Sequence, residues 1–249
     1  MNSALMVMWE RQVKEYYRNK QRMIGTLAQP LLFLVTFGFG LSPTFKEAGD
    51  GSYIQYLTPG IIGMTILFSS VMNGMSLIWD KQFGFLKETL VAPVSRTSLL
   101  FGRCLGGATI SIFQGLVVII ISFLMGFRIY HWGLFPVAVI LMFLMALLFN
   151  LLGTSIASKF DDFQSFPMIM NLLVMPMFFL SGALFPIKNF PAVIHVLARI
   201  NPVTYCMDLL KYAFSSGAEF NLLLDIAVLV VGIVALGMIG TYLFNRLET

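Results

Sequence analysis

Side chains able to perform acid–base or metal chemistry are few and scattered in this sequence of 249 residues. His131 and His195 each stand alone, and Cys104 and Cys206 lie far apart, which makes no metal site. Asp225 opens the last apolar run, where we expect it to lie within reach of a membrane surface. The sequence holds no GxxxxGK[ST] phosphate loop, so it cannot bind ATP in that way. We therefore expect no catalytic, cofactor-binding or metal site in this chain.

Uncharged polar side chains are the other groups that can make specific interactions, and they interrupt long apolar runs. They are Gln29, Thr36, Asn73, Ser111, Gln114, Asn150, Thr154, Ser155 and Asn171. Such groups often hydrogen-bond between membrane helices, and most of them are expected to do so here. A set of uncharged groups on several helices also suits a path for a solute that is largely apolar. The candidates for that path are Gln29, Thr36, Asn150, Asn171 and Met175.

The composition sets the kind of element that must position these groups. The chain is 58% hydrophobic and 11% charged, with a mean hydropathy of +0.84. A soluble domain carries about 25% charged residues, so we expect a polytopic membrane protein. Backbone groups in a bilayer must be satisfied internally, which predicts an all-α fold. The net charge of +4 is better explained by membrane topology than by nucleic-acid binding.

Six apolar stretches are each near the ~20 residues that a membrane-spanning helix needs. They are 23–41, 59–79, 104–127, 133–157, 166–187 and 222–244, within one transmembrane domain over residues 1–249. Their connections alternate sides. One side collects Arg11, Lys14, Arg18, Lys20, Arg22, Lys81, Lys87, Arg96, Arg103, Lys159 and Arg246. The other side collects Lys46, Arg128, Lys188, Arg199 and Lys211. Because positive loops stay inside, both termini are predicted to be cytoplasmic.

Residues 1–22 are predicted to form an amphipathic helix before the first span. The apolar residues Met6, Trp9, Val13, Tyr16 and Tyr17 share one stripe, and the charged residues fall elsewhere. Such a helix can lie in the headgroup plane with its aromatic side chains toward the lipid. The alternative is a solvated cytoplasmic tail.

The longest polar interruption between two of the early spans contains a second amphipathic helix, predicted over residues 81–93. Phe83, Leu86 and Leu90 have helical spacing, and Pro93 is a stop signal. One interpretation is a cytoplasmic loop that only helps to set topology. The other is a docking helix for a soluble partner.

Residues 188–221 are predicted to form an outer re-entrant helical hairpin between the last two spans. Two apolar helices, each too short to cross a bilayer, are separated at Asn201 and Pro202. The preceding span contains Pro176 and Gly182 and is expected to be irregular, since proline removes a helix hydrogen bond.

Three stretches in the same order carry a resemblance to a known family. These are YLTPGIIGMTILFSS (56–70), KQFGFLKETLVAPVSRTSLLFGR (81–103), and FFLSGALFPIKNFP (178–191) followed by INPVTYCMDLLKY (200–212). The sequence resembles the transmembrane subunit of a type-2 ABC exporter, the family of drug-resistance, polysaccharide and nodulation-factor export permeases.

The resemblance implies a homodimer in the cell inner membrane with two separate ABC ATPase subunits, which would hold ATP and Mg²⁺. It implies export of a drug-like or amphiphilic substrate, with a lipid-linked polysaccharide or other glycan as the alternative. The helix at 81–93 would then couple the membrane subunit to the ATPase subunits. Its coupling residues would be Phe83, Leu86, Lys87, Glu88, Thr89, Leu90 and Pro93. A membrane-embedded enzyme and a non-transporting scaffold or sensor are the other classes to be tested.

Overall fold

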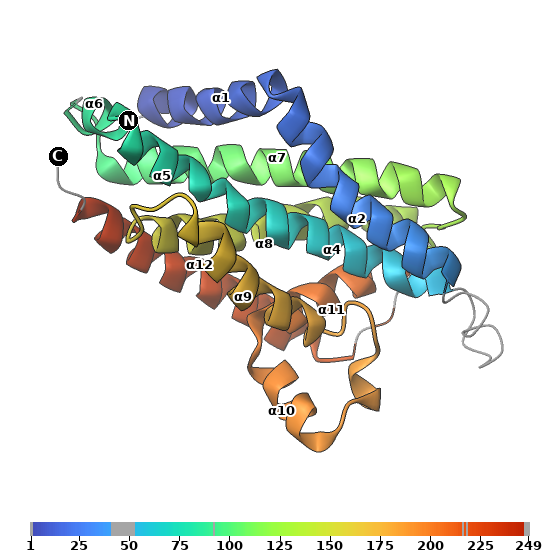
Figure 1. Ribbon diagram of the computed structural model, residues 1–249. Helices are drawn as coiled ribbons and strands as arrows, with labels where there is room; N and C mark the ends of the chain where they lie inside the picture. The colour runs from blue at the N-terminus through green and yellow to red at the C-terminus, as the bar shows by residue number, and fades with distance from the viewer. Residues whose placement is uncertain (1, 41–52, 92, 216, 218, 247–249) are drawn as a thin grey trace.

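The computed structural model describes residues 2–40, 53–91, 93–215, 217 and 219–246, and within them every regular element is a helix (Figure 1). Leu41, Lys46 and Ala92, which were assigned to the first span, an outer loop and the coupling helix, lie outside the described residues. The all-helical expectation is confirmed for the described part of the chain. The helices are α1 (Asn2–Arg18), α2 (Lys20–Gly40), α4 (Tyr53–Asn73), α5 (Met75–Gln82), α6 (Phe85–Val91), α7 (Arg96–Leu124), α8 (Phe135–Ala157), α9 (Ser165–Phe179), α10 (Ala192–Ile200), α11 (Pro202–Ser215) and α12 (Leu222–Asn245), with 3₁₀ turns η1 (Trp132–Leu134) and η2 (Ile187–Asn189).

Five helical stretches of the described residues are long and apolar enough to cross a membrane. They are Lys20–Gly40, Tyr53–Gln82, Arg96–Leu124, Trp132–Ala157 and Leu222–Asn245. The chain is therefore a multi-pass membrane protein. The predicted spans 23–41, 133–157 and 222–244 agree closely with α2, α8 and α12. The predicted span 104–127 begins too late, since α7 already starts at Arg96, where Ser95 caps the helix by accepting a hydrogen bond from the Ser98 amide at 3.2 Å.

The second span is longer than the predicted 59–79. It begins at Tyr53 and runs through α4 and α5 to Gln82, with a break at Gly74. The break faces α8. A Cβ at Gly74 would lie 2.5 Å from the Gly153 carbonyl oxygen, and one at Gly153 would lie 2.5 Å from the Val71 carbonyl oxygen. Two glycines thus let these backbones touch, and the span extends into the stretch expected to be polar loop.

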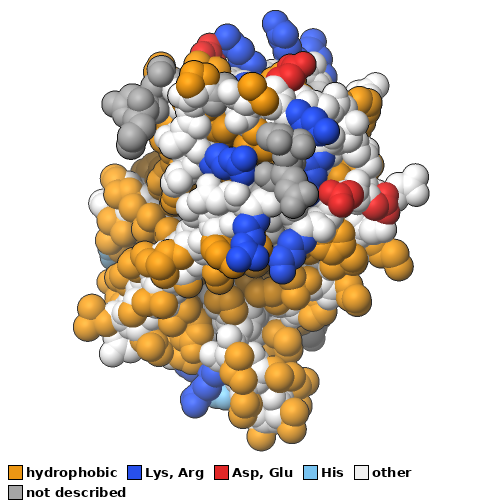
Figure 2. Space-filling view, turned by 90° about the vertical axis from the view of Figure 1, so that its left-hand side faces the viewer, with side chains coloured by type: hydrophobic (Ala, Val, Ile, Leu, Met, Phe, Trp, Pro, Cys, Tyr) orange, Lys and Arg blue, Asp and Glu red, His pale blue; other side chains and the backbone are white. Residues whose placement is uncertain are grey.

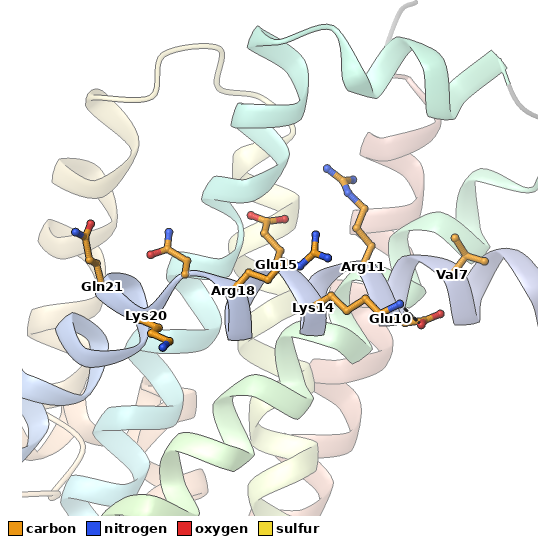
Figure 3. Close-up of a pocket in the computed structure, with 9 residues that line it drawn as sticks. Val7, Glu10, Arg11, Lys14, Glu15, Arg18, Lys20 and Gln21 are labelled. Atoms are coloured by element: carbon orange, nitrogen blue, oxygen red, sulfur yellow. Dashed lines mark ion pairs between the residues drawn. The ribbon is translucent and has the colours of Figure 1, made fainter.

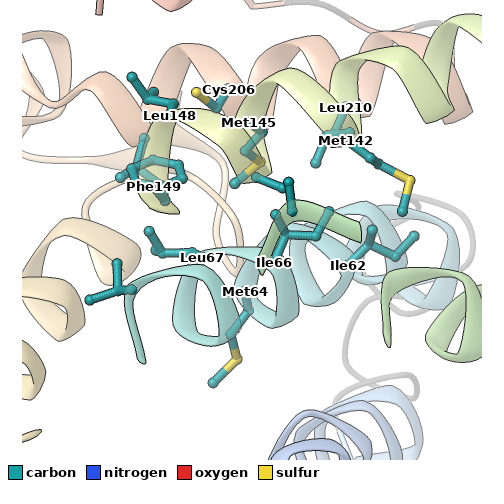
Figure 4. Close-up of a cluster of buried hydrophobic side chains, with 14 of the residues drawn as sticks. Ile62, Met64, Ile66, Leu67, Met142, Met145, Leu148, Phe149, Cys206 and Leu210 are labelled. Carbon is teal, nitrogen blue, oxygen red and sulfur yellow. The ribbon is translucent and has the colours of Figure 1, made fainter. Parts of the chain in front are cut away.

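The core lies around α4, most of whose side chains are buried. Figure 4 shows Ile62, Ile66 and Leu67 of α4 facing Met142 and Met145 of α8, with Cys206 and Leu210 of α11 on the same cluster. Flexible methionine side chains fill irregular gaps in such a cluster. Both cysteines are free and buried.

The predicted span 166–187 is wrong at its end, because α9 stops at Phe179. Its 15 residues give a length of about 22 Å, short of a ~30 Å hydrocarbon core. Gly182, with φ of 77°, turns the chain, a conformation that glycine adopts without strain. The Gly182 carbonyl oxygen then accepts bonds from Tyr56 Oη at 2.7 Å and Lys211 Nζ at 2.6 Å. The irregular end expected for this segment is confirmed.

The segment 188–221 forms the two short helices that were predicted, α10 and α11, separated at Asn201 and Pro202. The Asn201 side chain fixes the break. Its Nδ2 donates to the Met177 carbonyl at 2.6 Å, and its Oδ1 accepts from the Val203 amide at 3.1 Å. Helix α11 is buried in the bundle, whereas α10 protrudes (Figure 1). The depth of this hairpin in a bilayer stays a prediction.

Helix α1 buries a different face from the predicted stripe, and its position in the headgroup plane stays a prediction. It runs alongside α7 (Figure 1), so that Leu5 approaches Gly102, Trp9 Nε1 donates to Thr109 Oγ1 at 3.0 Å, and Tyr16 meets Gln114. The helices approach closely because α7 has glycine at 102 and 106. A Cβ at Gly102 would lie 2.7 Å from the Leu5 carbonyl oxygen, and one at Gly106 would lie 2.6 Å from Gln12 Cβ. The buried side chains are Met8, Gln12 and Tyr16, while the predicted stripe members Met6 and Tyr17 are 63% and 50% exposed.

One end of the bundle gathers both termini and α6, and we call it the α6 end (Figure 1). Arg96 Nη1 donates to the Asn245 carbonyl there at 2.7 Å, and Lys81 Nζ reaches the Ser158 carbonyl at 2.6 Å. Figure 2 looks onto this end and shows Lys and Arg side chains gathered on it, with hydrophobic side chains below and around them. The other end of the bundle is called the far end.

Candidate functional site

A buried ion cluster lies where α5 leads toward α6. Asp80 accepts from Arg11 through both guanidinium nitrogens, at 2.5 and 3.1 Å, and it also pairs with Arg103. Arg103 Nη1 donates to Ser76 Oγ at 3.0 Å. Asp80 and Arg103 are both buried, so one carboxylate joins α1, α5 and α7.

Sequence reasoning wrongly treated Asp80 and Arg103 as loop charges. The signal available was the spacing of Asn73, Ser76 and Asp80, which recur at i, i+3 and i+7. That spacing puts three polar groups on one face of a helix, and it marks a span that continues to residue 80.

Asn73 and Asn150 form a second polar contact inside the helix packing. Asn73 Nδ2 donates to the Gly107 carbonyl at 3.2 Å and lies 3.4 Å from Asn150 Oδ1. Asn150 Nδ2 donates to the Ala146 carbonyl at 2.8 Å, and Asn150 is 1% exposed. Asn73 of α4 therefore bonds to both α7 and α8, and Asn150 lines neither of the cavities described next.

A cavity of about 680 Å³ lies between α1–α2 and α4–α5. We call it the elbow cleft, because α1 and α2 meet at Asn19, whose Oδ1 caps α2 by accepting from the Arg22 amide at 3.0 Å. Its volume is typical of ligand pockets, roughly 300–1,000 Å³. Gln114 of α7 completes the lining together with Phe85 and Phe163.

A smaller cavity of about 230 Å³, the Gln29 pocket, continues between α2, α4 and α9. Gln29 and Asn171, two of the predicted path residues, both line it. It shares Thr26, Ser69 and Met72 with the elbow cleft. The two cavities are therefore neighbours, and we call them together the track.

Two other predicted path residues lie elsewhere. Thr36 is exposed on α2 and Met175 is half-buried on α9, and neither lines the track. Most of the track's surface is apolar, with uncharged polar groups spaced along it, and the elbow cleft is also lined by the charged residues Arg11, Glu15, Arg22 and Asp80. Such a surface can accommodate an amphiphilic molecule.

The predicted coupling helix is shorter than 81–93, and its apolar face is divided. Gly84, with φ of 77°, separates α5 from α6, so helix α6 covers only Phe85–Val91 and Pro93 lies beyond it. Leu86 is 5% exposed and packs inside this chain, whereas Phe83 is 71% exposed and stacks on Trp79 at 5.0 Å.

The remaining predicted coupling residues lie on α6 in different settings. Lys87 and Glu88 are exposed, Leu90 is half-buried, and Thr89 Oγ1 donates to the Leu86 carbonyl at 2.8 Å. Val91, which is not among the predicted coupling residues, is 76% exposed. The outward face of α6 is therefore made by Lys87, Glu88 and Val91.

The outward side of α1 forms an open charged groove of about 930 Å³. Figure 3 shows its side chains spread along α1 and the start of α2, from Val7 to Gln21. Lys14 pairs with Glu10 at 2.5 Å, and Arg18 and Lys20 are exposed. A single helix and its elbow supply this lining, which suits a charged surface rather than an enclosed site.

Three charged residues are buried near the far end. Asp225, in the first turn of α12, is 0% exposed, and its expected position within reach of the membrane surface stays a prediction. Asp208 of α11 accepts from the amides of Glu219 and Phe220 at 2.8 and 2.9 Å. Burial lowers the pKa of Lys211 to about 8, and its Nζ also lies 2.7 Å from Tyr56 Oη. The Asp208 contacts hold Glu219 and Phe220 against α11, and the Lys211 contacts hold the Gly182 turn.

Comparison with known proteins identifies the family. The model of the ABC-2 type transporter family matches residues 3–215. The chain is 28% identical over 249 residues to the inner membrane transport permease YadH of Escherichia coli K12, covering 98% of this chain and 95% of that protein. It is 24% identical over 226 residues to nodulation protein J of Rhizobium leguminosarum bv. viciae, covering 90% and 86% of the two chains. The chain therefore belongs to the ABC-2 type transporter family and is a multi-pass membrane transport permease.

Proposed function

We propose that this chain is the membrane-spanning subunit of an ATP-driven exporter that moves an amphiphilic, drug-like molecule from the cytoplasm or inner leaflet outward. The track carries this proposal. It joins the α6 end to the middle of α2, α4 and α9, and uncharged polar groups such as Thr26, Ser69 and Asn171 punctuate its apolar lining. Groups of that kind can hold the polar atoms of a substrate without trapping its apolar part.

The proposed assembly has two copies of this chain and two separate ABC ATPase subunits that bind ATP and Mg²⁺. The chain crosses the membrane six times, with the α6 end and both termini in the cytoplasm. The crossing added to the five long helices is the fifth in chain order. It runs from Asp161, which pairs with Lys81 at 3.2 Å, to Gly182, whose carbonyl accepts from Tyr56. The Lys and Arg side chains at the α6 end support this orientation, and the cations along α1 suit anionic lipid headgroups.

The ATPase is proposed to dock on α6. The exposed side chains Lys87, Glu88 and Val91 face outward, and a hollow of about 380 Å³ beside α6 is lined by Lys87, Lys159 and Arg246. Movement of α6 passes to α5 across Gly84. Because Asp80 ties α5 to α1 and α7, the helices that line the elbow cleft would then move together.

Export of a lipid-linked glycan is the second candidate function, and the aromatic lining of the elbow cleft favours it. Trp79, Phe83, Phe85 and Phe163 all line the cleft. Aromatic rings combine an apolar face with adaptable contacts, which suits the C–H faces of sugar rings. One relative is a nodulation protein, which fits a substrate other than a drug.

The test is transport by reconstituted vesicles that contain the chain and the ATPase that copurifies with it. Met72 is half-buried and lines both cavities, so Met72→Trp should block the track and abolish ATP-dependent export. Basal ATP hydrolysis and copurification should persist. The control is Phe39→Trp, on the exposed side of α2.

Other results would contradict the proposal. ATP hydrolysis by the purified chain alone would show that the ATPase site is not confined to a separate subunit. A stable complex with an ATPase that moves none of a panel of amphiphiles and glycolipids would favour the scaffold or sensor role. Unchanged export by Met72→Trp would remove the track from the pathway.

A further inference from the structure

Two buried carboxyl groups lie together near the far end of the bundle. Asp208 of α11 is 4% exposed, and its oxygens accept from the backbone amides of Glu219 and Phe220 at 2.8 and 2.9 Å. Those two residues lead directly into α12. Asp225 occupies the first turn of that helix, where its amide donates to the Asn221 carbonyl at 3.1 Å. The Asp225 carboxyl is 0% exposed and lies within hydrogen-bonding distance of the Asp208 carboxyl. One acidic side chain from each helix therefore meets in the contact between α11 and α12.

Asp225 has no compensating donor of its own. Neither of its oxygens receives a hydrogen bond from another described residue. Two ionised carboxylates cannot bond to each other, because both only accept, whereas a protonated carboxyl has one O–H to donate. Burying an unpaired charge is also far more costly than burying a neutral acid. One proton between the two groups removes both problems.

The nearby charges do not replace that proton. Lys211, the cation carried by α11, interacts electrostatically with Asp208 and Glu219. Its Nζ donates to the Gly182 carbonyl at 2.6 Å. One cation thus already faces two carboxylates before Asp225 is counted.

The other titratable groups on the helices that surround the pair do not supply a positive charge to it. They are Cys206, Tyr53, Tyr56, His195 and Arg199. The thiol and the two phenols are neutral at neutral pH, since their ordinary pKa values lie above it. The histidine and the arginine belong to α10, which protrudes from the bundle (Figure 1). Helices α8 and α9, which also pack on α11, carry no titratable side chain.

We propose that Asp208 and Asp225 form a proton-binding site, in which one proton shared by the two carboxyl groups joins α11 to α12. The two amide bonds favour the ionised form of Asp208, so the proton resides on Asp225, whose O–H donates to Asp208. Loss of the proton leaves two buried negative charges side by side, and their repulsion loosens the contact between the helices. The site is independent of the substrate that the chain transports.

The first test is infrared spectroscopy of the purified full chain in an alkyl maltoside, a detergent without a carbonyl group. A protonated carboxyl has a C=O stretching band separate from those of carboxylates, and exposed acids are ionised at neutral pH. The wild type should show this band at neutral pH and lose it at strongly alkaline pH. Asp225→Asn should lack the band. The control, Asp161→Asn, changes a carboxyl that is 90% exposed and should retain it.

Thermal unfolding over a range of pH is the second readout. The folded chain holds a proton that the unfolded chain has already released at neutral pH, so the stability contributed by the pair falls as the pH rises. Asp225→Asn places an N–H donor where the acid O–H stood, and it cannot titrate. Its melting temperature should therefore rise relative to the wild type as the pH is raised from neutral. Lys211 and Glu219 are present in both chains, so their titration does not produce this difference.

Three results would overturn the inference. One is a wild-type spectrum without a carboxylic-acid band that Asp225→Asn removes. Another is a difference in melting temperature that stays constant with pH. The third is stabilisation of the wild type by added Na⁺ or Ca²⁺ that Asp225→Asn abolishes, which would show a metal cation between the carboxylates.

If Asp225→Asn does not fold, Asp208→Asn provides the second variant. Its side-chain amide can donate to Asp225, which then ionises, so the carboxylic-acid band should again disappear. A band that persists in Asp208→Asn at neutral pH would refute the shared proton.

Discussion

Asp80 of α5 and Arg103 of α7 form an ion pair whose side chains are only 8% and 4% exposed. Arg11 of α1 reaches the same carboxylate. Removing one partner of a buried pair leaves the other charge without compensation, which costs more than losing a surface contact. The cluster thus fixes three helices at the point where α5 approaches α6.

Asp80→Ala is expected to lower the stability of the chain by about 3–5 kcal/mol, because Arg103 stays buried without a carboxylate. The measurement is thermal unfolding of the purified chain. Glu10→Ala is the control, since its pair with Lys14 is exposed on both sides and should change stability by about 0.5 kcal/mol or less. Equal losses in the two variants would show that the buried cluster has no special role.

Gly153→Ala should separate α8 from α4. Its Cβ would lie 2.5 Å from the Val71 carbonyl oxygen, which is closer than real contacts allow. We expect a loss of about 1–3 kcal/mol, as for other overpacked positions, measured by thermal unfolding. Gly25→Ala, where nothing lies within 4 Å, should be neutral or slightly stabilising because alanine favours helix. An undisturbed Gly153→Ala chain would contradict the close contact.

The divided face of α6 separates two effects of mutation. Leu86 is buried in this chain, so Leu86→Ala should lower the stability of the free subunit by about 2–5 kcal/mol.

Val91 is exposed, so Val91→Asp should leave stability unchanged and weaken copurification of the ATPase. Glu88→Ala should preserve the complex, since a rim charge adds little affinity, but reduce stimulated hydrolysis. Normal copurification with Val91→Asp would place the docking surface elsewhere.

The proposed orientation can be tested with single cysteines in a background that lacks Cys104 and Cys206. The exposed positions are Lys87 on α6 and Lys188 in the turn before α10. An impermeant thiol reagent applied to intact cells should label Lys188→Cys and spare Lys87→Cys. Cells permeabilised in the absence of the ATPase supply the control, because the proposed docking surface around position 87 is then uncovered and both positions should react. Labelling of position 87 alone in intact cells would reverse the orientation.

Lys211 predicts a dependence of stability on pH. Burial lowers its pKa from 10.5 to about 8, against smaller opposing effects of Glu219 and Asp208. Between these two values the unfolded chain binds a proton that the folded chain does not hold. Stability contributed by this residue should therefore rise as the pH rises from about 8 to about 10.5.

The measurement for Lys211 is the difference in melting temperature between the wild type and Lys211→Met at pH values below and within that window. The difference should shift in favour of the wild type inside the window. A difference that stays constant with pH would show that Lys211 has an ordinary pKa in the folded chain.

Local sequence properties were enough to predict several elements. Apolar runs long enough to cross a bilayer predicted α2, α8 and α12, because hydropathy and length are properties of a continuous stretch. The break at Asn201 and Pro202 was predicted for the same kind of reason, since proline restricts its own and the preceding residue. The polar groups Gln29 and Asn171 were also found from their unusual position in apolar runs, and the structure brings them together in one pocket.

Tertiary contacts decided which face of each helix is buried. A membrane helix can place apolar side chains toward lipid or toward its neighbours with little difference in hydrophobic free energy, so periodicity could not show that Met8 and Tyr16 are covered while Met6 is exposed. Leu86 and Phe83 were indistinguishable for the same reason.

Asp80, Arg103 and Gln114 acquire their settings only from segments distant in the chain. Arg11 and Arg103 compensate Asp80, and Tyr16 and Thr26 engage Gln114. The sequence by itself determined the class of protein and most of its helices, because those depend on local composition and spacing. The structure determined the ion cluster, the split face of α6 and the track, because these depend on which side chains meet across helices.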